Sequence, residues 1–315
     1  MLHGENGVKA VQALLEETGF AVSETCCSRP SCFDFAARKS EKVVILKTQP
    51  DVDSLSLSDS VELGDISKSV SAAPLMISTR ARDKPLEDDT VYSRYNVSTM
   101  TLKTLENIVS RGTYPLIQAG PGGYYVTIDG SAIRRRRQQL GQSVGKMAEL
   151  IGISRRTLYG YERGMAKASV TAAYNLISTL GIPVAKPVNV FEKATKERKC
   201  LLLTTARSIM SKNKLLMRIL AKFDHYGITT VRKAPFDFVI AIPEEKTRII
   251  GGVAAREEPG LEKRVDEIIS ISRIVQAYPI LVSDERRLPD KGIPCVRSEE
   301  LFKTKSPKDL IGGFK

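Results

Sequence analysis

The chain has 315 residues, 42% of them hydrophobic, and a net charge of +12 at pH 7. This length predicts two or three domains, and the apolar fraction is that of a globular protein with a sizeable core. No run of about 18 apolar residues occurs, and the first residues lack a basic segment followed by an apolar one, so we expect a cytoplasmic protein, neither membrane-bound nor secreted. The positive charge is concentrated in the middle: residues 131–167 hold nine basic and two acidic side chains, whereas residues 1–80 hold eight and eleven. This distribution indicates an anionic partner for the central segment.

The five cysteines do not form a metal-binding pattern. Cys26, Cys27 and Cys32 cluster, Cys200 and Cys295 are distant from them, and the chain has only two histidines. A zinc site needs four ligands, usually supplied as two closely spaced pairs. We therefore predict reduced thiols, no metal and no other cofactor.

Residues 1–82 are predicted to form a first α/β domain. The segment VKAVQALLEETGF has the apolar spacing of a helix that ends at Gly19. It is followed by FDFAARKSEKVVILK, two strands around a polar turn. A loop and helix in SLSLSDSVELGDISKSVSAA and a buried strand in PLMIS complete the domain.

Residues 83–130 are predicted to be a connector that contains a β-hairpin. In YPLIQAGPGGYYVTIDG, two apolar runs surround a Gly-Pro-Gly-Gly turn. The hairpin leads into residues 131–186, a helical domain of four to five helices. The two prolines of IPVAKPVNVF then indicate an extended exit segment.

Residues 197–315 are predicted to form a second α/β domain that is a diverged repeat of the first. A helix, a glycine and an apolar residue return in NKLLMRILAKFDHYGI, and Phe-Asp-Phe returns at residues 236–238. The strand RIIGGV parallels VVILK, and the helix LEKRVDEIISISRIVQA is followed by the strand YPILVSDER. The matching order of elements favours a duplication around the central domain.

The central segment has the signature of two helices joined by a sharp turn. Ser143 is a good N-cap for one helix, in which Met147, Ala148 and Leu150 are expected on the apolar side, and Ile133 and Leu140 on that of the preceding helix. Gly152 permits the turn, because glycine enters positive φ without steric cost. Ser154 begins the next helix, and Leu158 and Tyr161 face the core. Helix, glycine-containing turn and helix at this spacing form a DNA-reading unit.

This set of residues resembles the Cro/phage-repressor (XRE-like) helix-turn-helix family over about fifty residues. The resemblance makes residues 154–163 the recognition helix in the major groove. Base readers would be Arg155, Arg156 and Tyr159, since an arginine fork pairs with guanine O6 and N7. The expected phosphate-backbone contacts are Arg134, Arg137, Ser143, Lys146, Ser154, Thr157, Arg163 and Lys167.

Two positions depart from that family. Gly160 stands where a long polar reader is common, and Val144 replaces the usual glutamine at the start of the second helix. We expect Lys146 and the Arg134–Arg137 run to replace the lost phosphate anchor. Only some of four consecutive arginines can face DNA, because positions i and i+3 share a helix face whereas i and i+1 do not.

The flanking domains resemble the restriction-endonuclease and Holliday-junction-resolvase fold. Those enzymes hold a divalent metal with an aspartate at one strand and Glu-x-Lys on the next. Asp34 and Lys47 match two of these positions, but the glutamate position is Ile45. In the second copy Asp237 is present and no lysine follows. We therefore interpret Asp34, Lys47 and Asp237 as vestigial, in degenerate domains without catalysis.

Across its whole length the chain resembles an archaeal family of helix-turn-helix transcriptional regulators. The resemblance implies a cytosolic regulator that binds double-stranded DNA, and such modules usually read two half-sites, so we expect a homodimer. Two alternatives stay open: a structure-specific, metal-dependent nuclease targeted by the helix-turn-helix, and a scaffold whose basic helix binds RNA or an acidic protein.

Overall fold

The computed structural model describes residues 5–193, 214–223, 225–242, 247–255, 258–283, 292–304 and 306–310. The chain forms two compact units. The α/β unit contains the residues up to Ile77, residues 95–97 and the residues from Phe191 onward; the central unit contains residues 78–94 and 98–190. The stretch 197–213, which was expected to open the second domain, and Cys200 lie outside the described residues. No described helix is long and apolar enough to span a membrane.

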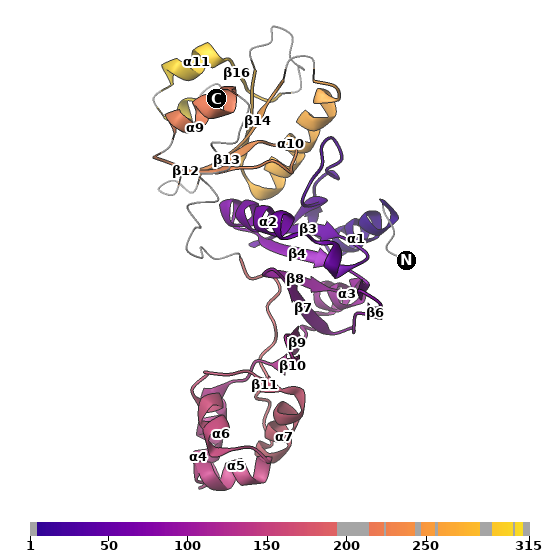
Figure 1. Ribbon diagram of the computed structural model, residues 1–315, viewed down its shortest axis with the longest axis vertical. Helices are drawn as coiled ribbons and strands as arrows, with labels where there is room; N and C mark the ends of the chain where they lie inside the picture. The colour runs from indigo at the N-terminus through magenta and orange to yellow at the C-terminus, as the bar shows by residue number, and fades with distance from the viewer. Residues whose placement is uncertain are drawn as a thin grey trace. The chain divides into compact units, whose positions relative to one another are not determined.

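The first α/β domain contains four strands of a mixed sheet and two helices (Figure 1). Strand order is β1-β2-β3-β4, with β1–β2 and β2–β3 antiparallel and β3–β4 parallel. The parallel step follows from the helix that crosses between β3 and β4. The elements are α1 (Glu5–Glu17), β1 (Ala21–Val22), β2 (Phe35–Lys39), β3 (Lys42–Thr48), the short 3-10 helix η1 (Val52–Ser54), α2 (Leu57–Val70) and β4 (Ala73–Ile77).

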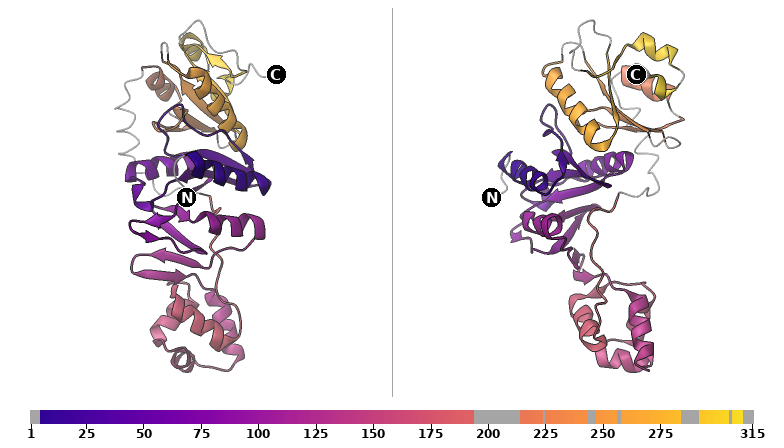
Figure 2. Two further views of the ribbon diagram at one scale, coloured as in Figure 1. Left: turned by 90° about the vertical axis from the view of Figure 1, so that its right-hand side faces the viewer. Right: turned by 180° about the vertical axis from the view of Figure 1, so that it is seen from behind.

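The second α/β domain repeats this arrangement. Its sheet has the order β12-β13-β14-β15-β16, again with two antiparallel pairs followed by a parallel pair across a helix, and with β16 added parallel to β15. Figure 2 shows α10 against this sheet from two sides. The elements are α9 (Lys214–Lys222), β12 (Gly227–Thr230), β13 (Phe238–Ile242), β14 (Thr247–Val253), α10 (Leu261–Val275), β15 (Tyr278–Val282), β16 (Cys295–Val296), α11 (Ser298–Lys303) and the 3-10 helix η3 (Pro307–Leu310).

The central unit begins with more regular structure than the predicted connector. Besides the hairpin of β9 and β10, it contains strands β7 and β8 and the amphipathic helix α3, capped by Thr101 and ended by Gly112. The strand order is β8-β7-β9-β10-β11. These elements are β5 (Arg80–Ala81), β6 (Lys84–Pro85), β7 (Thr90–Arg94), β8 (Val97–Met100), α3 (Leu102–Arg111), β9 (Ile117–Gly120), β10 (Gly123–Val126) and β11 (Ala168–Ser169).

Four helices complete the central unit. They are α4 (Gly130–Gln139), α5 (Val144–Ile151), α6 (Arg155–Glu162) and α7 (Val170–Leu180). The exit segment is extended, as predicted: Asp129 N donates to Val184 O, and Lys186 N donates to Thr127 O. Those two bonds join the segment to the chain that enters α4, so both ends of the helical bundle are tied together.

Candidate nucleic-acid interface

The bundle of α4 to α7 is built from well-capped helices. The hydroxyls of Ser143, Ser154 and Ser169 each accept a hydrogen bond from the backbone N–H three residues later, which satisfies a donor that the helix leaves open. Gly152 ends α5 with φ 79°, a conformation that glycine adopts without strain. The predicted caps and turn are therefore confirmed.

The bundle core fixes α6 against its neighbours. Leu158 and Tyr161 are buried, as predicted, and pack with Ile133 of α4 and Met147 and Ile151 of α5. Two further predictions are wrong. Leu140 and Leu150 were expected in the core but are 39% and 54% exposed, because Leu140 is already the C-cap of α4 and Ile151 takes the buried position at the end of α5.

A close backbone approach also holds α4 to α6. A Cβ atom added at Gly130 would lie 2.2 Å from Tyr161 O and 2.7 Å from Glu162 O. Any side chain at position 130 would therefore displace the end of α6. The N-terminus of α4 is capped by Asp129, whose carboxylate accepts hydrogen bonds from the N–H groups of Ser131 and Ala132.

The four consecutive arginines of α4 do not share one environment. Arg134 and Arg135 are exposed, and Arg136 Nε donates to Leu180 O at 3.0 Å. Arg137 is buried: its guanidinium makes a two-point pair with Glu162 and donates to Gln142 O at 2.9 Å. This pair raises the pKa of Arg137 above its usual range. Arg137, expected among the phosphate contacts, is instead an internal link between α4 and α6.

The predicted base readers lie on the exposed face of α6. Arg155, Arg156 and Tyr159 are exposed, and they belong to the first two turns of the helix. The guanidinium of Arg155 rests over Gly145 of α5, where an added Cβ would approach its Nε to 2.6 Å. Arg163 stacks on the Tyr159 ring, 4.9 Å from its centroid. Gly145 leaves room for Arg155, a role that no sequence motif indicated.

The remaining expected backbone contacts are exposed or partly so, and several already have partners. Lys146 pairs with Glu149 at 3.1 Å, and Lys167 Nζ donates to Gln118 Oε1. Thr157 shares a hydrogen bond with the cap hydroxyl of Ser154. Exposed pairs of this kind contribute little, so a phosphate could exchange for them at low cost.

The predicted vestigial site of the first domain is an internal ion pair. Asp34 Oδ1 is 2.7 Å from Lys47 Nζ, and its Oδ2 accepts a hydrogen bond from Thr48 N at 2.6 Å. Ile45, at the position of the missing glutamate, is buried. Within the described ranges no group of three or more His, Cys, Asp or Glu side chains could hold a metal ion. These residues therefore do not fit the divalent metal that the nuclease fold implies.

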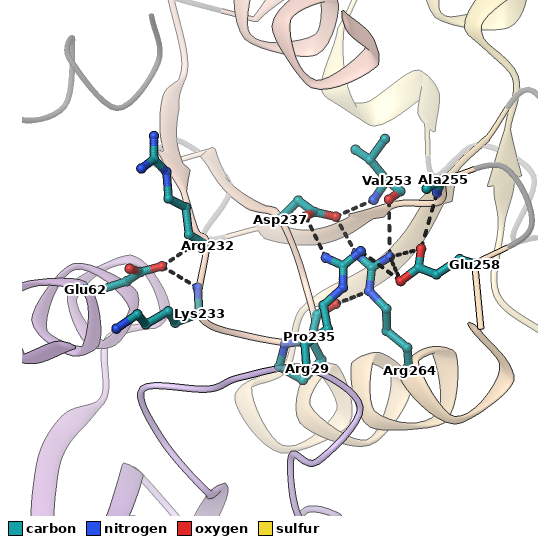
Figure 3. Close-up of polar contacts among 10 residues, drawn as sticks. All are labelled: Arg29, Glu62, Arg232, Lys233, Pro235, Asp237, Val253, Ala255, Glu258 and Arg264. Atoms are coloured by element: carbon teal, nitrogen blue, oxygen red, sulfur yellow. Dashed lines mark hydrogen bonds and ion pairs between the residues drawn. The ribbon is translucent and has the colours of Figure 1, made fainter. Parts of the chain in front are cut away.

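The corresponding aspartate of the second domain, Asp237, is surrounded by two arginines, one from each α/β domain (Figure 3). Asp237 binds Arg29 at 2.9 Å and also binds Arg264, and its Oδ2 accepts from Val253 N. Glu258 binds the same two arginines. Arg264 is 1% exposed and takes the space beside Gly252, where an added Cβ would lie 3.4 Å from its Nη2. Two guanidinium groups stand where a metal site would need open carboxylates.

Comparisons with known proteins find two domain families in this chain. Residues 5–115 match the PD-(D/E)XK superfamily domain, and residues 133–186 match a helix-turn-helix domain. A relative from Methanocaldococcus jannaschii, named "Putative HTH-type transcriptional regulatory protein", is 32% identical over 90% of this chain and 89% of its own. The chain belongs to this archaeal family of HTH-type regulatory proteins.

Other family members are similarly close. A relative from Archaeoglobus fulgidus with the same name is 31% identical over 98% of this chain and 96% of its own. One from Haloarcula marismortui is 30% identical over 96% and 94%. A solved structure titled "SinR protein/SinI protein complex" shares 19% identity over 30% of this chain and 93% of that chain, with a TM-score of 0.16, too low to support a conclusion about fold.

Proposed function

We propose that the protein regulates transcription by binding double-stranded DNA sequence-specifically, with α6 in the major groove. The observation that carries the proposal is the exposed pair Arg155 and Arg156 at the N-terminal end of a helix whose other face is fixed by Leu158, Tyr161 and the buried Arg137–Glu162 pair. A recognition helix needs such a rigid base, because base-edge contacts depend on geometry within a fraction of an ångström.

The charge of the bundle supports the proposal. After removal of Arg137 from the expected contacts, exposed cations remain on α4 and α6, namely Arg134, Arg135, Arg155, Arg156 and Arg163. Phosphate contacts supply affinity and orientation, whereas base contacts supply specificity. The names of the relatives point to the same role.

The decisive experiment compares two double variants of the full chain. Arg155→Ala with Arg156→Ala should abolish preference for the duplex selected by the wild type, because each good arginine–guanine contact contributes about 1–3 kcal/mol of discrimination. Arg134→Ala with Arg135→Ala is the matched control: it removes the same charge and should weaken binding to all duplexes while preserving the selected sequence. Binding is measured on selected and scrambled duplexes at two salt concentrations.

The outcomes separate the hypotheses. If the α6 variant selects the same sequence as tightly as the wild type, α6 is not the recognition helix. If the wild type binds RNA and duplex DNA equally well, the interaction-scaffold alternative is favoured. If it binds neither, the proposed function is wrong.

A nuclease is the second candidate, because residues 5–115 match the PD-(D/E)XK superfamily domain. We propose that the chain is not an enzyme: both aspartates at the fold's metal position are engaged by cations, and Ile45 replaces a carboxylate. Incubation with junction and duplex DNA in Mg²⁺ or Mn²⁺ should give no cleavage. Cleavage that disappears in Lys47→Ala would establish the alternative.

The homodimer and the cytoplasmic location that the sequence analysis expected stay predictions.

A further inference from the structure

The two α/β domains can be aligned residue by residue from their hydrogen bonds. Each domain has an aspartate whose N–H donates to a carbonyl of the following strand and whose carboxylate accepts from the amide two residues further on. The bonds are Asp34 N to Leu46 O at 2.7 Å and Thr48 N to Asp34 Oδ2 at 2.6 Å, then Asp237 N to Gly251 O at 2.8 Å and Val253 N to Asp237 Oδ2 at 2.6 Å. Lys47 of β3 therefore corresponds to Gly252 of β14.

The helices align in the same way. The C-cap of α2 is Ser71 and that of α10 is Gln276, and both cap residues have the left-handed conformation with φ 55°. Each cap stands two residues before the strand that pairs in parallel with β3 or β14. Counting back from the caps, Glu62 corresponds to Glu267. Both carboxylates are buried, at 5% and 0% exposure, so each needs strong hydrogen-bond donors.

Each of these glutamates binds the other domain. Glu62 Oε1 accepts from the backbone N–H groups of Arg232 and Lys233, as Figure 3 shows. Glu267 Oε1 accepts from those of Cys27 and Ser28, both at 2.9 Å. The two acceptor segments also correspond. Cys26 N donates to Asp34 O, and Val231 N donates to Asp237 O. Cys27 and Ser28 are therefore the equivalents of Arg232 and Lys233 in the alignment of the two domains.

Two further contacts agree with this arrangement. Each helix receives an arginine from the other domain's sheet, although the two arginines occupy different strand positions: Arg38 of β2 donates to Ile274 O on α10, and Arg248 of β14 donates to Ser69 O on α2. Ile274 and Ser69 are equivalent, each two residues before its helix cap. At the centre, the equivalent rings of Phe33 and Phe236 contact each other with centroids 6.3 Å apart.

This reciprocity is the rule of a twofold interface, in which residue i of one copy contacts j of the other and j contacts i. A residue meets its own equivalent only on the axis, as the two phenylalanines do. No symmetry requires such contacts within a single chain. The pattern is therefore best explained if the two domains once paired as identical subunits.

We infer that the second α/β domain acts as a built-in partner subunit for the first, in a pair that descends from a homodimer of one such domain. The surface formed by residues 26–29 and α2 fits a second copy of the same domain, and this chain supplies that copy itself. The α/β domains therefore do not hold two chains together. A homodimer of chains would use surfaces outside this pair.

A disulfide placed across the interface tests the inference without reference to DNA. Ser69 Oγ lies 2.7 Å from Thr229 Oγ1, so replacing both hydroxyls by thiols places two sulfurs within bonding range. The full-length Ser69→Cys/Thr229→Cys variant is oxidised mildly and analysed by non-reducing electrophoresis and peptide mass mapping. The single variants, which retain the native cysteines, are the controls.

The expected product is a monomer with an intrachain bond between positions 69 and 229, absent from both controls. Adding Glu62→Ala and Glu267→Ala should slow its formation at least about tenfold, because each carboxylate accepts two amide hydrogen bonds. Adding Glu41→Ala, an exposed carboxylate of the first domain, should leave the rate unchanged. A covalent dimer joined through positions 69 and 229, or thiols that stay free under oxidant, would overturn the inference.

Discussion

Arg137 of α4 and Glu162 at the end of α6 form a buried two-point ion pair, with Nε–Oε1 at 2.6 Å and Nη2–Oε2 at 3.0 Å. Their side chains are only 10% and 6% exposed. Because a planar guanidinium and a carboxylate meet in one fixed geometry, the pair sets the orientation of α6 as well as its position. The helix proposed to read DNA is therefore oriented from inside the bundle.

Removing Glu162 should destabilise the central unit strongly. Glu162→Ala leaves the Arg137 charge buried without its carboxylate, and we expect a loss of about 3 kcal/mol in the free energy of unfolding. Glu149→Ala, which breaks the exposed pair with Lys146, is the control and should cost less than about 1 kcal/mol. Urea denaturation measures both. Equal losses would show that burial of the Arg137–Glu162 pair has no energetic consequence.

Replacement of neighbouring arginines of α4 should have different effects on the salt dependence of DNA binding. Arg134 is exposed, whereas Arg136 is bonded to Leu180 O. We expect Arg134→Ala to lower the slope of log affinity against log salt by about 0.9, the value for one lost phosphate contact, and Arg136→Ala to change it much less. Fluorescence anisotropy titrations with duplex DNA at several salt concentrations measure the slopes. A larger change in Arg136→Ala would reverse the assignment.

Two glycines of the bundle should respond in opposite directions to alanine. A Cβ at Gly160 or Gly164 meets no atom within 4 Å, but Gly164 has φ 67° and Gly160 is an ordinary residue of α6. We expect Gly160→Ala to raise stability by about 0.5–1 kcal/mol and Gly164→Ala to lower it by about 1 kcal/mol. Thermal unfolding of the two variants checks the prediction, and a shared sign would contradict it.

Acid should weaken the start of α4. Hydrogen bonds from Ser131 and Ala132 hold the pKa of Asp129 below its ordinary value, with Lys186 contributing. The stability that this cap provides is therefore present above the unfolded pKa of about 3.9 and is lost as the pH falls through the lower folded pKa. Asp129→Asn keeps a capping oxygen but does not titrate, so its unfolding temperature should fall less between pH 5 and pH 2. If the unfolding temperature of the wild type and of Asp129→Asn falls by the same amount, the Asp129 cap does not contribute to the pH dependence of stability.

The two arginines that bind Asp237 should contribute unequally to the free energy of unfolding. Arg264 is 1% exposed and donates to Pro235 O and Val253 O as well as to Asp237 and Glu258, whereas the Arg29 side chain is 27% exposed. Arg264→Met should cost about 3–5 kcal/mol, because it leaves buried carbonyls and carboxylates short of donors. Arg29→Met should cost clearly less. Urea denaturation of the α/β unit within the full chain compares them.

The local features were predictable from the sequence because local rules produce them. The serine caps, the turn at Gly152 and the polar turn between β2 and β3 follow from the chemistry of a few adjacent residues. The environments of Arg134 to Arg137 could not be predicted, because only the packing of α4 against α6 makes the last of them internal. The Glu62 and Glu267 contacts were equally invisible: their donors are backbone amides, which every sequence has.

The helix position of Arg264 in the second domain is occupied by Asp59 in the first, and Asp59 binds Lys233 of the second domain. In an assembly of identical subunits a mutation is inherited by both sides at once, so a helpful change on one side must be tolerated on the other. A fused pair has no such constraint. One half could keep its Asp34–Lys47 pair, while in the other half Gly252 stands at the lysine position and Asp237 is bound by Arg264 and by Arg29 of the first half. Joining the copies gave each half its own mutational history.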